Sequence, residues 1–366
     1  MEDVGLKQLF GGIYHQKRVL ITGHTGFKGS WLAAWLEAMG ASVFGLSLAP
    51  ESEPNHFDLL SPSYPSYIQD INVREKVRAR IQEIRPEIVF HLAAQALVRR
   101  SYRDPVETFH TNVIGTAHIL DACRELESLK AIVVVTTDKC YENREWVWPY
   151  RENDPLGGKD PYSASKAAAE ILAASWRHSF FSAENTNVLL ATARAGNVIG
   201  GGDWAEDRLI PDIVRAMARN ESLHIRYPEA TRPWQHVLEP LSGYLLLGKK
   251  LLEGKAEYAE AWNFGPEMQS NLPVRALVEK AREYWPELRF EVSREKAVHE
   301  ARLLMLDSTK AKTMLQWRNV WDFTRVMKYT LQWYRDFYEN NTLNTLDDLS
   351  AYVGDARAQG LDWATV

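Results

Sequence analysis

Cysteine is scarce in this chain, and long apolar runs are missing altogether. The two cysteines, Cys123 and Cys140, stand in no CxxC pair and beside no histidine cluster, so we expect no zinc or other metal site. Two scattered thiols are typical of a reducing compartment, and we expect a cytoplasmic protein. No run approaches the ~18–20 apolar residues of a membrane span, and residues 1–17 lack the apolar core of a signal peptide.

An excess of either charge is also missing. Lys and Arg number 43 against 48 Asp and Glu, which gives a formal net charge of −5. A chain without a basic surplus does not offer the footprint of a nucleic-acid or anionic-membrane binder. We therefore expect neither partner, and any anion site has to be local. At 366 residues the chain is long enough to bury a large core and to divide into two lobes.

Glycine is concentrated where an apolar run gives way to a helical pattern. Val19–Ile21 has the length and branched side chains of a buried strand, and residues 27–39 have helical period. Between them glycine recurs every third residue, at Gly23, Gly26 and Gly29. A strand, a glycine-rich turn and a helix form the phosphate site of a nucleotide-binding unit. This context favours a dinucleotide site over an ordinary strand-to-helix loop.

Strands and helices alternate through the first half of the chain. Strand patterns lie at 19–21, 41–48, 87–92, 131–137 and 188–195, and helical patterns at 27–39, 73–84, 105–126 and 161–180. This order predicts an α/β fold with a doubly wound parallel (Rossmann) sheet. Ligands of such sheets lie beyond the carboxyl ends of the strands. We therefore expect one crevice where the strand ends converge, at Gly23, Ala93, Thr136–Asp138 and Ala195–Asn197.

The pattern loosens after Gly200–Gly202. We expect a dinucleotide-binding domain over residues 1–196, with about 230–264 returning to it. A smaller, interleaved C-terminal lobe for the substrate is expected from 197–229 and 265–340. Residues 341–366 have the composition of a polar C-terminal tail.

A tyrosine and a lysine, Tyr162 and Lys166, stand one helical turn apart where the helix at 161–180 begins. Side chains at i and i+4 share one face of a helix. A lysine ammonium beside a phenol lowers the phenol pKa from its reference value near ~10, so Tyr162 can act as a base near neutrality. This spacing also arises by chance on helix surfaces, but the position at the carboxyl edge of the sheet favours a catalytic pair.

The segment Thr136-Thr137-Asp138-Lys139 ends the preceding strand at the same edge. A threonine hydroxyl there can hydrogen-bond the substrate hydroxyl that Tyr162 deprotonates. Asp138 and Lys139 add two titratable groups. The alternative is a simple turn that Asp138 caps, but the expected approach of Tyr162 favours a site.

Six short motifs follow one another along the chain. They are Gly23-x-x-Gly26-x-x-Gly29, His91-Leu92-Ala93-Ala94-Gln95, Thr111-Asn112-x-x-Gly115-Thr116, Tyr162-x-x-x-Lys166, Arg208-Leu209-Ile210-Pro211 and Arg232–Val237. Together they resemble the extended short-chain dehydrogenase/reductase family, and its nucleotide-sugar branch in particular, over residues 17 to 335. Thr137-Asp138-Lys139-Cys140-Tyr141 resembles the CDP-glucose 4,6-dehydratases. The dTDP-glucose dehydratases carry Thr-Asp-Glu there, and simple 4-epimerases lack the acidic residue.

The resemblance implies an NAD-dependent, redox-neutral loss of water from CDP-glucose, in deoxy-sugar (O-antigen, lipopolysaccharide) biosynthesis. It implies that Tyr162, beside Lys166, takes the proton of the sugar 4-hydroxyl while Thr137 holds that oxygen. It further implies that Asp138 protonates the departing 6-hydroxyl and that Lys139 removes the C5 proton. An ordinary lysine is almost wholly protonated at neutral pH. Lys139 is therefore a base only in its neutral form; otherwise it orients the substrate, and a water or Asp138 takes the proton.

The resemblance also implies which residues bind the ligands. For NAD they are Gly23, Thr25, Gly26, Phe27, Lys28, Gly29, Ser47, Asp70, Ile71, Leu92, Ala93, Ala94, Thr111, Tyr162 and Lys166. For the nucleotide sugar they are Gln95, Asn197, Arg208, Leu209, Ile210, Arg232, Asn263 and Arg302. Residues 46–50 carry no acidic residue for the adenosine ribose, and no Arg or Lys for a 2′-phosphate. NAD is therefore favoured over NADP.

Other functions stay open at this stage. One is another NDP-glucose dehydratase, because the sequence does not identify the base. A second is a UDP-sugar 4-epimerase or C4 reductase, although epimerisation needs no acid such as Asp138. A third is an inactive dinucleotide sensor, which would not need Tyr162 and Lys166 together. As in the family, the helices at 105–126 and 161–180 are expected to pair in a homodimer or homotetramer.

Overall fold

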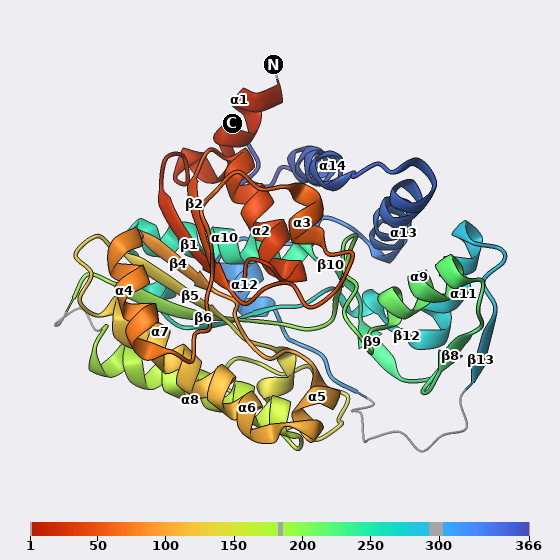
Figure 1. Cartoon of the computed structure of the whole chain (residues 1–366), viewed down its shortest axis with the longest axis horizontal. Helices are drawn as coiled ribbons and strands as arrows, with labels where there is room; N and C mark the ends of the chain where they lie inside the picture. The colour runs from red at the N-terminus through yellow and green to blue at the C-terminus, as the bar shows by residue number, and fades with distance from the viewer. Residues whose placement is uncertain (1, 182–185, 293–302, 366) are drawn as a thin grey trace.

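A computed structural model describes residues 2–181, 186–292 and 303–365 of the chain and shows two lobes (Figure 1). The larger lobe holds a sheet between two layers of helices, and the smaller lobe stands at the right of the view. The two termini lie close together at the top of the larger lobe. In the part of the chain that is described, no helix is long and apolar enough to cross a membrane.

The sheet of the larger lobe has seven strands. They are β1 (Arg18–Thr22), β2 (Ser42–Ser47), β3 (Ser66–Ile68), β4 (Ile88–His91), β5 (Ala131–Val135), β6 (Leu189–Ala195) and β11 (Ala261–Phe264). Their spatial order is β11-β6-β5-β4-β1-β2-β3, and every neighbouring pair is parallel. The order reverses between β1 and β4, where such sheets hold their ligands. The doubly wound α/β fold predicted from the sequence is therefore confirmed.

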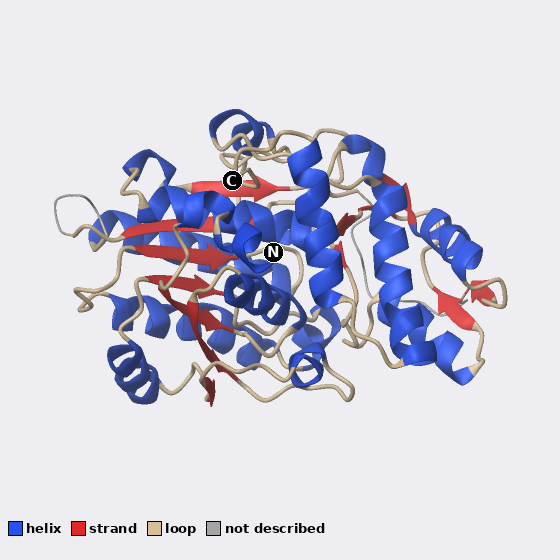
Figure 2. Cartoon of the chain, turned by 90° about the horizontal axis from the view of Figure 1, so that it is seen from above, coloured by secondary structure: helices blue, strands red, loops and turns tan. Residues whose placement is uncertain are grey.

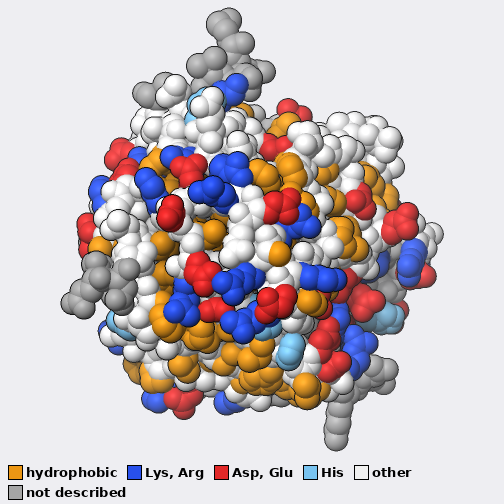
Figure 3. Space-filling model, turned by 60° about the vertical axis from the view of Figure 1, so that its left-hand side comes forward, with side chains coloured by type: hydrophobic (Ala, Val, Ile, Leu, Met, Phe, Trp, Pro, Cys, Tyr) orange, Lys and Arg blue, Asp and Glu red, His pale blue; other side chains and the backbone are white. Residues whose placement is uncertain are grey.

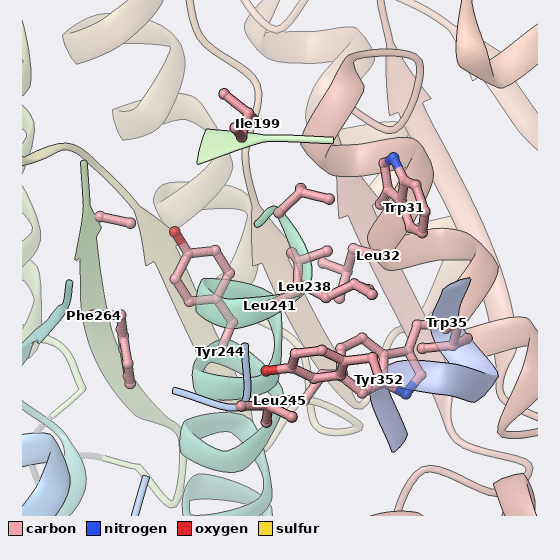
Figure 4. Close-up of a cluster of buried hydrophobic side chains, with 14 of the residues drawn as sticks. Trp31, Leu32, Trp35, Ile199, Leu238, Leu241, Tyr244, Leu245, Phe264 and Tyr352 are labelled. Carbon is pink, nitrogen blue, oxygen red and sulfur yellow. The ribbon is translucent and has the colours of Figure 1, made fainter. Parts of the chain in front are cut away.

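Side chains of the strands alternate between two buried layers. Val19 and Ile21 face one layer, whereas Leu20 between them faces the other. The first layer holds α2 (Phe27–Ala38) and α10 (Leu238–Leu252), and the second holds α4 (Arg74–Ile84), α7 (Thr116–Cys123) and α8 (Pro161–Ser179). Figure 4 shows the first layer, where leucines of α10 point toward Trp31 and Trp35 of α2. Burial on both faces explains why most residues of the central strands are apolar.

The smaller lobe packs helices against two short strand pairs. It contains α9 (Leu209–Arg219), β8 (Leu223–Ile225), β9 (Thr231–Pro233), β12 (Asn271–Pro273), α11 (Val274–Tyr284) and β13 (Phe290–Val292). β8 pairs with β13 in parallel, and β9 pairs with β12 antiparallel. The remaining elements are α1 (Glu2–Lys7), α3 (His56–Leu60), α5 (Val98–Arg103), α6 (Pro105–Phe109), β7 (Val198–Ile199), β10 (Gln235–His236), α12 (Thr309–Met314), α13 (Phe323–Asn340) and α14 (Thr345–Ala358). Seen from above, the strands of the large sheet end on the side of the smaller lobe (Figure 2).

The single helix predicted over residues 105–126 is interrupted. A π-helical turn, His110–Gly115, separates α6 from α7. In this turn the side chain of Asn112 accepts the N–H of Gln95 at 2.8 Å and donates to its carbonyl at 3.0 Å. A π turn is a local insertion that often marks functional sites, and an amphipathic pattern does not reveal it.

The prediction of a polar tail at 341–366 is wrong. Residues 345–358 form α14, and its buried face is Leu349, Tyr352, Val353 and Ala356. Further on, Trp363 stacks on Phe10 with ring centroids 5.1 Å apart, and its carbonyl accepts the N–H of Phe10 at 2.7 Å. The acidic residues of α14 lower its mean hydropathy, although its apolar residues keep the i, i+3, i+7 spacing of a packed helix.

A buried carboxylate ties this C-terminal helix to the larger lobe. Glu239 of α10 accepts the N–H of Val320 at 3.0 Å and of Trp321 at 2.8 Å, and the hydroxyl of Tyr352 at 2.9 Å. Burial raises the pKa of Glu239 to about 7, although these hydrogen bonds oppose the rise.

We expect Glu239→Gln to change how stability depends on pH. The unfolded carboxyl titrates near ~4.3, and the folded one at about 7. The free energy of unfolding contributed by this group is therefore full below the unfolded pKa and falls as pH rises through the folded pKa. Urea unfolding at several pH values between ~4 and ~8 should show that fall in the wild type and a flatter profile in the variant. A Glu287→Gln control, at an exposed position, should follow the wild type; parallel profiles for wild type and Glu239→Gln would contradict the prediction.

Candidate active site

A cleft of about 1570 Å³ runs along the carboxyl edge of the large sheet and between the two lobes. Pockets for one small ligand usually measure ~300–1000 Å³, so this cleft has room for more than one. The ends of β1, β4, β5 and β6 line it from one side, and α9 and β8 line it from the other. The predicted convergence is found: Gly23, Ala93, Thr136–Asp138 and Ala195–Asn197 all line this space.

The structure brings nearly all of the predicted ligand and catalytic residues to this cleft. Asn263 is an exception, because it is fully buried at β11. Its amide accepts the hydroxyl of Tyr141 at 2.8 Å and donates to the carbonyl of Tyr150 at 2.9 Å. Its predicted substrate contact is therefore corrected to a supporting role. Arg302 lies outside the described residues, and no metal-binding cluster of His, Cys, Asp and Glu occurs within them.

The three glycines of the first turn differ in how much space a side chain would have at each position. Gly23 has φ +77°, and a Cβ there would lie 2.7 Å from the nitrogen of Ala93. A Cβ on Gly29 would lie 2.1 Å from the carbonyl oxygen of Gly23. A Cβ on Gly26 would meet that same oxygen at an ordinary 3.4 Å. Packing therefore requires glycine at the first and third positions, whereas the second leaves open space that faces the cleft.

The start of α2 fits an anionic group at this open space. Gly26 is the N-cap residue, and no side chain caps the helix. Uncapped backbone N–H groups at a helix N-terminus are a ready anion site. Lys28, in the first turn, lines the same cleft. Burial, together with the nearby charges of Arg208 and Lys166, lowers the pKa of Lys28 to about 7.

The neighbouring end of β2 presents hydroxyl groups to the cleft. The Thr25 hydroxyl lies 2.9 Å from that of Ser47 and within 2.9 Å of the carbonyl of Leu48. Beyond them, Glu51 and Glu53 also line the cleft. Sequence reasoning missed these two acids because it looked only at residues 46–50, directly after the strand. Carboxylates at this position disfavour an additional phosphate group by charge repulsion, although Arg100, at 2.6 Å from Glu51, offsets part of that charge.

Tyr162 and Lys166 begin α8 as predicted, but Lys166 does not lower the pKa of Tyr162 as we expected. Burial raises the pKa of Tyr162 to about 12, while a hydrogen bond with Thr137 and the charge of Arg208 act in the opposite direction. The Lys166 ammonium donates instead to the carbonyl of Val135 at 3.4 Å. Burial lowers the pKa of Lys166 itself to about 8. Desolvation, which a sequence does not show, therefore outweighs the helix spacing.

Asp138 is poised to carry a proton. It is 3% exposed, and burial raises its pKa although Lys139 opposes the rise. The Thr137 hydroxyl donates to its Oδ1 at 3.0 Å. Gly196 makes room for this carboxyl group, because a Cβ there would lie 2.7 Å from Oδ2 of Asp138. Thr137 thus contacts both the acid Asp138 and the phenol of Tyr162.

The smaller lobe faces these groups with more arginines than the sequence predicted. Arg208, which we expected, pairs with Asp203 at 3.0 Å and reaches the cleft. Arg215 and Arg219 of α9 also line it. Their spacing of four residues places both on one helix face, a signal that we did not use. Several arginines suit a pyrophosphate, which they pair with in a bidentate manner.

Comparison with known proteins identifies related chains. A family model described as GDP-mannose 4,6 dehydratase matches residues 20–330. The CDP-glucose 4,6-dehydratase of Salmonella typhimurium is 49% identical over 325 residues, which cover 87% of this chain and 90% of that protein. The UDP-glucose 4-epimerase of Mycoplasma genitalium is 26% identical over 347 residues, covering 88% and 96%.

Solved structures share the fold. The UDP-glucose 4-epimerase of Thermotoga maritima, determined with UDP-glucose, superposes with a TM-score of 0.73 at 25% identity and covers 88% of this chain and 99% of its own. The dTDP-glucose 4,6-dehydratase of Streptomyces venezuelae, determined with NAD, has a TM-score of 0.72 at 23% identity, with coverage of 87% and 97%. At such low sequence identities, these similarities show a shared fold.

We expect substitutions at two of the glycines to separate folding from ligand binding. Gly26→Ala should fold normally, because its Cβ meets protein atoms at 3.4 Å, whereas Gly29→Ala should be unstable because of a 2.1 Å clash. Thermal unfolding of both variants and calorimetric titration of Gly26→Ala with NAD provide the measurements. NAD affinity of Gly26→Ala should fall more than about tenfold, which is ~1.4 kcal/mol. A wild-type affinity would mean that the phosphates lie elsewhere.

Proposed function

The chain belongs to the GDP-mannose 4,6-dehydratase family, within the nucleotide-sugar branch of the extended short-chain dehydrogenases and reductases, and we propose that it is an NAD-dependent CDP-glucose 4,6-dehydratase. The observation that carries the proposal is the placement of Asp138 and Lys139 in the same cleft as Tyr162. An epimerase has no use for an acid at that position. The Salmonella relative, which carries the same activity in its name, supports the choice of CDP-glucose.

The larger lobe, residues 1–196 with 230–264, would hold NAD. The open space at Gly26, the uncapped start of α2 and the hydroxyls of Thr25 and Ser47 fit a dinucleotide. When bound there, NAD supplies the chemistry that takes a hydride from C4 of the sugar and returns it to C6, so that the net reaction is loss of water. The smaller lobe, residues 197–229 and 265–340, would hold the nucleotide sugar through Arg208 and its neighbours.

The chain's own residues move the protons. Tyr162 takes the proton of the 4-hydroxyl once its own phenol has ionised; burial, which raises its pKa to about 12, opposes that ionisation, whereas the hydrogen bond with Thr137 and the charge of Arg208 favour it. Thr137, which is hydrogen-bonded to Tyr162, holds the same substrate oxygen. Burial raises the pKa of Asp138, which favours the protonated form, and in that form Asp138 protonates the departing 6-hydroxyl, because hydroxide is a poor leaving group. Lys139 removes the C5 proton or orients the sugar at that step.

A product assay tests the proposal directly. Purified protein is incubated with NAD and, in separate reactions, with CDP-, dTDP-, UDP- and GDP-glucose. We expect a 4-keto-6-deoxy product from CDP-glucose and no net change in NAD. Product from another nucleotide alone would contradict the choice of base. An epimer without loss of water would contradict dehydration.

Asp138→Asn should separate oxidation from loss of water. Tyr162 and Thr137 act earlier, at C4, so the variant should oxidise the sugar once and then stall. Rapid quenching and mass spectrometry should find up to one equivalent of CDP-4-keto-glucose per site, with 6-deoxy product reduced by ~10²-fold or more. In the comparison variant, Tyr162→Phe, neither species should form. If Asp138→Asn also forms neither while it binds substrate, Asp138 acts in the oxidation through its bond to Thr137.

An exposed apolar surface supports the proposal of a homodimer or homotetramer. Figure 3 shows hydrophobic side chains gathered along the lower edge of the molecule, where α6 to α8 lie in Figure 1. Val106 of α6 is 77% exposed and Ile171 of α8 is 60% exposed; exposed Phe109 ends α6, and exposed Ile114 lies in the π-helical turn that follows it.

Both cysteines are free and buried, which fits the reducing cytoplasm that we propose as the location of the protein.

Charged substitutions on this surface should dissociate the assembly. Val106→Glu combined with Ile171→Glu should reduce the mass measured by light scattering to that of one chain, without loss of secondary structure. Val147→Glu, at a 72% exposed position outside this surface, serves as the control and should leave the mass unchanged. An unchanged mass in the double variant would place the interface elsewhere.

A further inference from the structure

A buried ion pair lies directly behind the segment that carries the reacting groups. Glu170 of α8 and Arg194 of β6 are each 3% exposed, and Nη2 of Arg194 donates to Oε2 of Glu170 at 2.8 Å. The Thr192 hydroxyl also donates to Oε2, at 2.7 Å. Neither Glu170 nor Arg194 lines the cleft, so the mechanism does not use them. A buried ion pair is weak evidence for stability, because well-packed apolar residues often replace it without loss.

The ion pair holds both ends of the turn Thr137–Cys140. At one end, the hydroxyl of Thr136 donates to Oε1 of Glu170. At the other, Nη1 of Arg194 donates to the hydroxyl of Tyr141 at 2.7 Å. Thr136 directly precedes the turn, and Tyr141 directly follows it. The ion pair is therefore hydrogen-bonded to the residue before the turn and to the residue after it. Thr137, Asp138 and Lys139 lie between these two contacts.

The same ion pair fixes the catalytic helix against this turn. Tyr162, Lys166 and Glu170 stand at successive i+4 positions of α8, and hence on one face of the helix. The bond from Thr136 to Glu170 thus joins the helix that carries Tyr162 to the strand end that carries Thr137. The relative position of these two side chains decides whether the phenol and the threonine hydroxyl can reach one substrate oxygen.

We propose that Glu170 and Arg194 are positioning residues that hold the turn Thr137–Cys140 in register with α8 through Thr136 and Tyr141. This inference rests on the proposed function only for its kinetic readout. In catalysis, misplacement of positioned groups by even ~1 Å can cost ~10² in rate. Loosening of the turn should therefore lower kcat, while the substrate-binding arginines, which lie on the other lobe, keep KM.

Two buried threonines provide a matched comparison. Thr136 and Thr192 both donate to the Glu170 carboxylate, but only Thr136 adjoins the turn. Thr136→Val should lower kcat for CDP-glucose more than about tenfold and leave KM within about threefold. Thr192→Val removes an equivalent hydrogen bond and should leave kcat within about twofold of wild type. Thr136→Ser keeps the hydroxyl and should restore kcat. Thermal unfolding should show similar losses of stability for the two valine variants.

A second readout does not depend on activity. Within the turn, the N–H of Cys140 donates to the carbonyl of Thr137 at 3.4 Å, and that of Lys139 donates to the Thr137 hydroxyl at 3.3 Å. Hydrogen exchange of a peptide covering 137–141 should be faster in Thr136→Val than in Thr192→Val by more than about tenfold. Equal exchange and equal kcat in the two variants would overturn the proposal. If the wild-type protein does not dehydrate CDP-glucose, the proposed function is wrong. Hydrogen exchange would still test the positioning role of Glu170 and Arg194.

Discussion

Desolvation of ionisable side chains is the physical constraint on which this site depends. The carboxyl edge of the sheet is covered by the smaller lobe, so groups that end there are buried. The consequence is uniform: burial raises the pKa of Asp138 and Tyr162 and lowers that of Lys28 and Lys166. Each shift favours the neutral form of its group. Protonation of a leaving hydroxyl at neutral pH requires an acid such as Asp138 in its protonated form, whereas Tyr162 has to lose its proton against this shift before it can act as a base.

The fold could be predicted to a large extent from the sequence because its strands are buried on both faces. Runs such as Ala131–Val135 are apolar throughout, and β11, Ala261–Phe264, lies at the end of the segment 230–264 that we expected to return to this domain. Prediction failed where another interaction overrides pattern. In the π-helical turn, the side chain of Asn112 hydrogen-bonds both backbone groups of Gln95, a contact that the helical pattern does not reveal. The helix α14 has a polar outer face, and its burial becomes evident only when the whole chain is assembled.

The candidate site could be predicted in its membership but not in its electrostatics. Strand ends of a parallel sheet meet at one edge, so Gly23, Thr137 and Asn197 could be brought together without coordinates. Which charge each group holds depends on solvent exclusion and on residues distant in the sequence, such as Arg208 beside Tyr162. Asn263 shows the opposite error. The family resemblance implied a ligand contact for Asn263, but its side-chain amide donates to the main-chain carbonyl of Tyr150.

The closing residues of the chain bear on the order in which the protein can be assembled. Trp363 packs against Phe10 and Trp35, and Trp35 belongs to the helix that begins at the phosphate turn. A ribosome releases the N-terminal residues first, yet the side chains that cover this helix are among the last to emerge. The nucleotide-binding half is therefore synthesised long before its apolar surface can be closed. Loss of the residues around Trp363 would therefore expose apolar side chains of the N-terminal half, far away in the sequence.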